Sequence, residues 1–271
     1  VAFIENLAVA IDSTRARALC LIEAAGAAMD ADRFVEADRL IEQGLVKVNG
    51  EVVSTLGAKF PENVRIELTQ QGQAQQAERV TIMINKPVGY VSGQAEDGYI
   101  PAVRLITAET QSKTDTTSQQ LKPSMFRGLA PAGRLDIDSQ GLLVLTQDGR
   151  IAKQLIGADS ELEKEYLVRV KGDVTPERIA QLCFGLQLDG KPLKRAKVRQ
   201  INPEQLQMIL REGKKRQIRR MCEAVGLHVT GLKRVRIGEL RLGQLEEGQW
   251  RFVKPNEFKH RAPRRRPSRK R

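Results

Sequence analysis

The stretch "GRLDIDSQGLLVLTQDG", residues 133–149, decides both the fold and the site of this chain. Residues 142–146, Leu-Leu-Val-Leu-Thr, form an apolar run that is typical of a buried strand. Asp136 and Asp138 stand just before that run. A carboxylate at the mouth of a buried strand needs a cationic partner or hydrogen bonds. Either this is a turn with ordinary polar residues, or one of the two acids does chemistry.

Asp136 is the stronger candidate because it lies between two apolar residues and follows Arg134. A carboxylate that an arginine keeps ionised is a plausible nucleophile or base. The alternative is a turn aspartate with a local hydrogen bond. Asp138 precedes Ser-Gln-Gly, which is typical of a turn, so we do not expect it to be catalytic.

A second group of charges lies in "KKRQIRR", residues 214–220. Its cations are Lys214, Lys215, Arg216, Arg219 and Arg220. The three arginines have the i, i+3, i+4 spacing that places side chains on one side of a helix. The functional interpretation is contact with phosphates, with one arginine turned inward to a carboxylate. The alternative is a solvated basic face.

The charge balance points to a polyanionic partner. The 271 residues carry a formal net charge of +12, and residues 259–271 alone hold eight Lys or Arg and no acid. Nucleic acid is the simplest partner for so dense a basic segment, and a solvated, disordered tail is the alternative.

Other classes of protein fit the sequence poorly. Three widely spaced cysteines and two histidines favour neither a disulfide scaffold nor a zinc site. The apolar runs are far shorter than a membrane span, and the first residues make a poor secretion signal. We therefore expect a cytoplasmic protein with no membrane partner and no metal.

Residues 1–68 predict a small N-terminal domain. Helical patterns cover 16–28 and 32–43, and Gly44 is a suitable helix stop. Alternating residues around Asn49-Gly50 then predict a hairpin, because this dipeptide favours tight hairpin turns.

Residues 69–79 are rich in glutamine and lack large apolar side chains, so we expect a linker. Strands outnumber helices over 80–258, without a regular strand–helix repeat. This pattern predicts an α+β fold with a mixed, mainly antiparallel sheet. Within it, 107–128 is expected to be a flexible loop, and Thr175 is expected to cap a helix. We expect 259–271 to be a disordered basic tail.

Several of these stretches resemble one enzyme family. The 133–149 stretch resembles the signature of the RsuA-like pseudouridine synthases of bacterial ribosomal RNA. "NKPVGYVSG", "EKEYLVRV", "RQIRRMC" and "LKRVRIGELRL" resemble further motifs of that family, in the same order. The first 68 residues resemble the small α-L RNA-binding domain that precedes the catalytic domain. "RQIRRMCEAVG" resembles most the RluF subgroup, which acts on large-subunit rRNA.

The resemblance implies roles for individual residues. Asp136 is the expected catalytic aspartate, and Arg219 is expected to pair with it. Arg134 is expected to hold the extruded nucleotide or its place in the stack, and Tyr166 to lie against the target uracil. On residue type alone, Tyr166 would more often be a core tyrosine. The expected RNA-contacting residues are Lys86, Lys214, Lys215, Arg216 and Arg220.

The resulting hypothesis is a cofactor-free enzyme that isomerises uridine to pseudouridine in ribosomal RNA. We expect the enzyme to be a monomer and its substrate to be 23S rRNA. Its partner would be this RNA or a pre-ribosomal particle. The bond from uracil to ribose must break, which calls for a carboxylate acting on the sugar. One alternative is a non-catalytic rRNA-binding or ribosome-assembly protein. A further alternative is a base-removing enzyme that does not rejoin the uracil.

Overall fold

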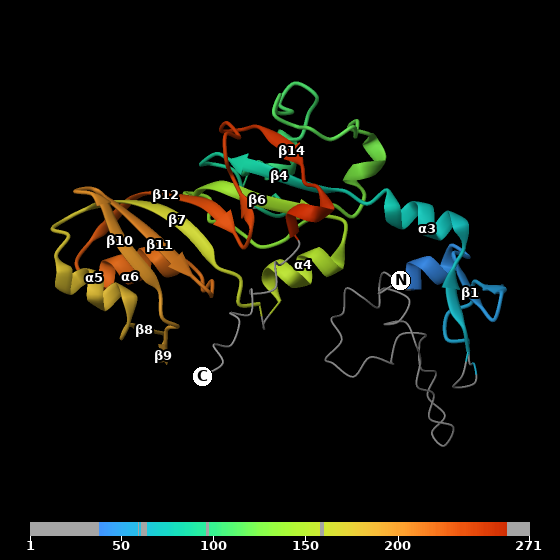
Figure 1. The fold of residues 1–271 in the computed structure, drawn as a ribbon, viewed down its shortest axis with the longest axis horizontal. Coiled ribbons are helices and arrows are strands. Elements are labelled where there is room, and N and C mark those ends of the chain that lie inside the picture. The colour runs from blue at the N-terminus through green and yellow to red at the C-terminus, as the bar shows by residue number, and fades with distance from the viewer. Residues whose placement is uncertain (1–37, 59, 61–63, 96–97, 158–159, 259–271) are drawn as a thin grey trace, which may run out of the picture. The chain divides into compact units, whose positions relative to one another are not determined.

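The structure is a computed structural model that describes residues 38–58, 60, 64–95, 98–157 and 160–258. The chain divides into two compact units, Val1–Arg79 and Val80–Arg271 (Figure 1). Within the described ranges, no helix has the length and apolar character needed to cross a membrane.

The first unit is built on a three-stranded antiparallel sheet with the order β2-β1-β3. Its strands are β1 (Val46–Val48), β2 (Glu51–Val53) and β3 (Ile66–Leu68). Asn49 and Gly50 have φ values of 51° and 90°, so the predicted hairpin turn is confirmed. Gly44, with φ of 64°, follows the helical residues 38–42. The expected helix over 16–28 and the start of the second lie outside the described residues.

Residues 69–79 are not an irregular linker but contain helix α3 (Gln70–Ala77). Thr69 caps this helix by accepting a hydrogen bond from the Gly72 amide. A Cβ on Gly72 would lie 2.9 Å from the Leu45 carbonyl, so the helix packs closely on the first unit. The expectation of a linker was wrong because glutamine and alanine favour a helix once it is capped.

The second unit contains a nine-stranded sheet with the main order β10-β11-β7-β12-β6-β4-β14. Every pair is antiparallel except β12 with β6, which confirms the predicted mixed, mainly antiparallel sheet. The strands are β4 (Thr81–Lys86), β5 (Ala130–Pro131), β6 (Gln140–Thr146), β7 (Lys164–Lys171), β10 (Lys197–Asn202), β11 (Gln205–Leu210), β12 (His228–Ile237), β13 (Leu240–Arg241) and β14 (Trp250–Phe252). A separate pair consists of β8 (Gln187–Leu188) and β9 (Lys191–Pro192).

Three α-helices cover parts of this sheet. They are α4 (Gly149–Ile156), α5 (Pro176–Cys183) and α6 (Gln217–Ala224). The predicted cap is confirmed, since Thr175 accepts a hydrogen bond from the Arg178 amide. Short 3-10 turns are η1 (Ala102–Leu105), η2 (Pro123–Phe126) and η3 (Pro255–Phe258). Buried side chains of α5 and α6 pack with those of β7, β11 and β12 in one core cluster.

The segment 107–128 was expected to be a flexible loop, but it is tied to β14. The Ser112 amide donates to the Trp250 carbonyl at 2.8 Å, and the Trp250 indole donates to the Thr107 carbonyl at 2.8 Å. The Phe252 amide donates to the Asp115 carboxylate at 2.9 Å. These bonds satisfy the backbone of an edge strand, so the segment serves as part of the fold.

Candidate active site

The loop 133–139 connects β5 to β6 and carries Asp136. The turn after β4 holds this loop from one side. The Gly89 amide donates to the Ile137 carbonyl at 2.9 Å. The buried Ser92 hydroxyl donates to the Leu135 carbonyl at 2.8 Å and accepts from the Leu135 amide at 2.9 Å. Segments that are distant in the sequence therefore fix the backbone on both sides of Asp136.

Two arginines hold the loop from the other side. Arg234 of β12 donates from Nη1 to the Arg134 carbonyl at 3.2 Å and from Nε to the Leu142 carbonyl at 2.8 Å. Arg219 of α6 donates from Nη2 to the Asp138 carbonyl at 2.8 Å. With these bonds, the loop depends on β12 and α6 as well as on the turn after β4.

Asp138 is the acid that the arginines bind. Arg216 donates to its two carboxylate oxygens at 3.2 and 2.9 Å, and Nε of Arg219 lies 3.2 Å from Oδ2. Partial burial acts to raise the pKa of Asp138, but the Arg216 hydrogen bond and the charge of Arg219 outweigh it and lower that pKa. The expected pairing of Arg219 with Asp136 is therefore wrong, because Arg219 is already placed against the Asp138 backbone.

Asp136 has a different environment. It is half-buried, and its carbonyl accepts from the Ser139 amide at 3.0 Å. None of the described residues forms a hydrogen bond or ion pair with its carboxylate. Its charge nevertheless acts on Arg216 and on Lys86, whose pKa values both respond to it. The carboxylate thus interacts electrostatically with two cations and accepts no hydrogen bond from the described residues.

Lys86 is fully buried, which does not suit the expected contact with RNA. Its ammonium donates to the carbonyls of Pro87 at 2.8 Å and Tyr90 at 2.9 Å. Burial lowers the pKa of Lys86 to about 8, although the charges of Asp138 and Asp136 act to raise it. Lys86 is the last residue of β4, whose six residues are all buried, and its side chain bonds to carbonyls of the turn that follows the strand.

Tyr166, Arg234 and Lys86 are linked across the sheet. Arg234 is paired with Tyr166 on β7 and with Gly141 on β6, and Gly141 is paired with Lys86 on β4. Gly141 has φ of +105°, and a Cβ there would lie 2.3 Å from the Arg234 carbonyl oxygen. Only glycine fits at this position, so the alignment of Tyr166, Arg234 and Lys86 on neighbouring strands depends on Gly141.

Arg234 was not predicted as a site residue. It is 3% exposed, and its Nη2 is buried without a hydrogen-bond partner among the described residues. The signal was present in "LKRVRI", where Arg234 alternates with Leu232 on the buried side of the strand. An arginine at an apolar position of a strand needs buried acceptors, and here they are loop and strand carbonyls.

The remaining residues that were predicted to contact RNA do not gather at one place in the structure. Arg220 pairs with Asp189, with bonds of 3.0 and 2.6 Å, and so does not face the loop. Lys215 and Arg134 are exposed, whereas Lys214 is half-buried and its amide donates to Gln217. No group of three metal-ligating side chains occurs in the described part of the chain. The site can thus offer a carboxylate, buried cations and exposed cations for an anionic ligand.

Comparison with known proteins gives consistent matches. The RNA pseudouridylate synthase model matches residues 80–224, and the S4 domain model matches 33–66. A dual-specificity RNA pseudouridine synthase RluF from Salmonella typhi is 36% identical over 226 residues, which are 82% of this chain and 72% of that protein. A ribosomal large subunit pseudouridine synthase B from Bacillus subtilis (strain 168) is 32% identical over 230 residues, covering 83% and 88%.

A solved structure agrees with these matches. The crystal structure of a pseudouridylate synthase superimposes with a TM-score of 0.57 at 28% identity, covering 83% of this chain and 92% of that one. The family resemblance inferred from the motifs is therefore confirmed, and so is the fold.

Proposed function

Because this chain belongs to the RNA pseudouridylate synthase family, we propose that it isomerises a specific uridine of large-subunit ribosomal RNA to pseudouridine. The name of the Bacillus subtilis relative supports the large subunit as the source of the substrate. The S4 match and the net charge of +12 support an RNA partner. The cytoplasm, where rRNA is made and assembled, is the compartment that this proposal requires.

The observation that carries the proposal is the contrast between the two loop aspartates. Asp138 is held by Arg216 and Arg219, while the Asp136 carboxylate interacts electrostatically with the buried Lys86 and accepts no hydrogen bond from the described residues. A carboxylate whose oxygens accept no hydrogen bond from the protein has both oxygens available to a substrate. We assign Asp136 to the step in which the bond between uracil and ribose breaks, either by attack on the sugar carbon or by removal of a sugar proton.

The uracil must then turn and rejoin the same sugar through a ring carbon. The target nucleotide has to leave the RNA stack to reach a carboxylate in this loop. We propose that Tyr166 lies against the detached base and that the exposed Arg134 occupies or supports its place in the RNA. Lys215 and Arg216, both exposed beside the loop, are suited to neighbouring phosphates.

The test is expression in a strain that lacks rRNA pseudouridine synthases of this class, with pseudouridine mapped across both large rRNAs by carbodiimide modification and primer extension. We expect one new site with the wild-type chain and none with Asp136→Asn, which should still bind RNA. Asp189→Asn is the matched control, because Asp189 pairs only with Arg220 among the described residues. The Asp189→Asn variant should still produce the new pseudouridine.

The outcomes separate the alternatives. A new site that persists in Asp136→Asn would overturn the role of Asp136. The absence of any new site with the wild-type chain, together with retained RNA binding, would favour the non-catalytic rRNA-binding protein. Release of free uracil, detected in purified reactions, would favour a base-removing enzyme instead.

A further inference from the structure

The half of the sheet formed by β10, β11, β7 and β12 has two unlike faces. Helices α5 and α6 cover one of them, where Tyr166, Val168 and Val170 of β7 are buried (Figure 1). Leu167, Arg169 and Lys171 alternate with these residues and so point to the other face. Neither α5 nor α6 packs on that second face, which we call the open sheet face. Helix α4 packs at the end of β12, in a cluster with Val235 and Ile237.

The open sheet face is rich in cations. Strand register places Arg199 beside Gln207, Gln207 beside Leu167, and Leu167 beside Lys233. On β7, Arg169 follows two residues after Leu167, and Lys171 follows two residues after Arg169. The cations of this face are Lys171, Arg169, Lys197, Arg199, Lys233 and Arg236, with Arg211 just beyond the end of β11.

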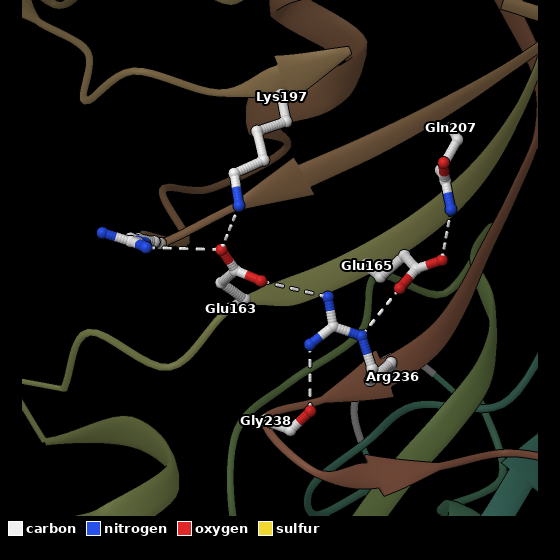
Figure 2. Close-up of polar contacts among 7 residues, drawn as sticks. Glu163, Glu165, Lys197, Gln207, Arg236 and Gly238 are labelled. Atoms are coloured by element: carbon white, nitrogen blue, oxygen red, sulfur yellow. Dashed lines mark hydrogen bonds and ion pairs between the residues drawn. The ribbon is translucent and has the colours of Figure 1, made fainter. Parts of the chain in front are cut away.

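The first acid of this face, Glu163, is already neutralised (Figure 2). Its carboxylate accepts from Lys197 at 2.8 Å, from Arg236 at 3.2 Å and from Arg211 at 3.4 Å. The hydrogen bond from Lys197 is the largest of the causes that lower the pKa of Glu163 to about 2. Glu163 therefore stays ionised and bound to its cations at any pH near neutrality.

The second acid, Glu165, is held in the same network. It accepts from Arg236 Nε at 2.7 Å and from the side-chain amide of Gln207, as Figure 2 shows. Arg236 thus joins both acids and adds a bond to the Gly238 carbonyl at 2.9 Å. Neither carboxylate is left to compensate the cations further along the strands.

Four cations of the open sheet face remain uncompensated. Arg169, Lys171, Arg199 and Lys233 form no ion pair with any acid in the described part of the chain. Residues two apart on a strand are separated by about 7 Å, so their charges repel one another unless an anion lies over them. A run of phosphates is an anion that suits this spacing of side chains.

We propose that the open sheet face is a second RNA-binding surface, which contacts the sugar-phosphate backbone of rRNA away from the target uridine. This inference rests on the proposed function. The occupant is RNA rather than protein, because the cores of protein interfaces are depleted in charged residues as a class and enriched in aromatic residues, whereas this face presents several cations of one sign. The face lies opposite Tyr166, so RNA bound there extends beyond the segment that enters the site.

The experiment compares two RNAs. One is a short stem-loop that contains the mapped uridine, and the other is full-length 23S rRNA. The test variant carries Arg169→Gln, Lys171→Gln and Arg199→Gln together. We expect its affinity for the long RNA to fall about ten-fold at moderate salt, and the slope of log affinity against log salt to flatten by about 2 to 3. Turnover of the short stem-loop should not change.

The matched control carries Lys191→Gln, Lys194→Gln and Arg195→Gln. These three cations are also exposed, but they flank Leu193, which packs in the helix-covered core cluster. The control variant loses the same charge and should bind the long RNA with nearly wild-type affinity and slope. Thermal unfolding of both variants checks that each is folded.

Three results of the binding experiment with the two RNAs would overturn the inference. They are an unchanged salt slope, an equal loss for the test and control variants, and an equal loss on both RNAs. Loss of binding to ribosomal particles with unchanged binding to naked RNA would assign the face to a protein and would overturn it too. Filter binding needs no turnover, so an inactive wild-type chain would count against the proposed function and not against this surface.

Discussion

At the scale of single residues, two aspartates that stand two positions apart have opposite environments. Asp138 accepts bonds from Arg216 and contacts Arg219, whereas Asp136 does not. The sequence predicted Asp136 as the reactive acid but assigned Arg219 to the wrong partner. The bond from Arg219 to Asp138 joins residues 81 positions apart, and local spacing cannot tell which of two neighbouring acids such a residue reaches.

We expect the buried Lys86 to make the reaction sensitive to alkaline pH. The pKa of its buried ammonium is about 8, so the positive charge beside Asp136 is lost as pH rises through that value. We expect the single-turnover rate of the wild-type enzyme to fall as pH rises above about 8, which gives the pH–rate profile an alkaline limb. Lys86→Met should remove the limb and lower the rate near pH 7 by about ten-fold, equivalent to roughly 1.4 kcal/mol. Lys153→Met, at an exposed helical position, is the control and should keep the limb.

The stability of the fold should change in the opposite direction with pH. The folded pKa of Lys86 is lowered below the ordinary value of 10.5, so the unfolded chain binds more protons between about pH 8 and that value. The contribution of Lys86 to the free energy of unfolding therefore rises over this window. Urea unfolding at pH 7 and 9 distinguishes the two effects, and a limb that persists in Lys86→Met would contradict this role.

Gly141 is the second residue on which the site depends. We expect Gly141→Ala to lower the free energy of unfolding by about 3 kcal/mol or more, because it adds a clash with the Arg234 backbone to an unfavourable φ. The matched control is Gly243→Ala, where φ is +58° but no atom lies within 4 Å of the added Cβ. It should cost only about 1 to 2 kcal/mol. Equal losses in urea unfolding would show that the contact with Arg234 is unimportant.

At the scale of elements, the loop 133–139 is held by partners that lie outside it. Ser92 makes two of these bonds, to the amide and the carbonyl of Leu135. Ser92→Ala leaves both groups buried and unpaired at that point, at a cost of about 1 to 3 kcal/mol. We expect kcat to fall while RNA affinity is kept, in kinetic and filter-binding assays. Ser124→Ala, at an exposed position, should change neither, and a Ser92→Ala enzyme with wild-type kcat would contradict this role.

Local chemistry explains which elements the sequence predicted. The Asn49-Gly50 turn and the Thr175 cap depend on neighbouring residues alone, and both are confirmed. The segments 69–79 and 107–128 were predicted to be a linker and a flexible loop because of their polar composition. Their structure depends instead on contacts with Leu45 and β14, which no local pattern contains. Lys86 was missed as a buried cation for the same reason.

At the scale of the whole molecule, the fold class followed from strand count and spacing, but the strand order did not. β12 lies between β7 and β6 and is parallel to β6, although 81 residues separate the ends of those two strands. Such pairing is set by packing of the finished sheet rather than by any one segment. The same order explains why Arg234, on β12, reaches a loop that precedes it by 100 residues.

The position of β12 also has a consequence during synthesis on the ribosome. A growing chain carries Asp136 long before it carries residues 219 and 234, whose side chains bind the loop carbonyls. Until β12 has paired with β6 and β7, these two strands are not joined in one sheet and the loop lacks the hydrogen bond from Arg234. Long-range pairing of this kind forms late in folding. We therefore expect the loop 133–139 to gain its full set of hydrogen bonds only after residues 219 and 234 have been translated.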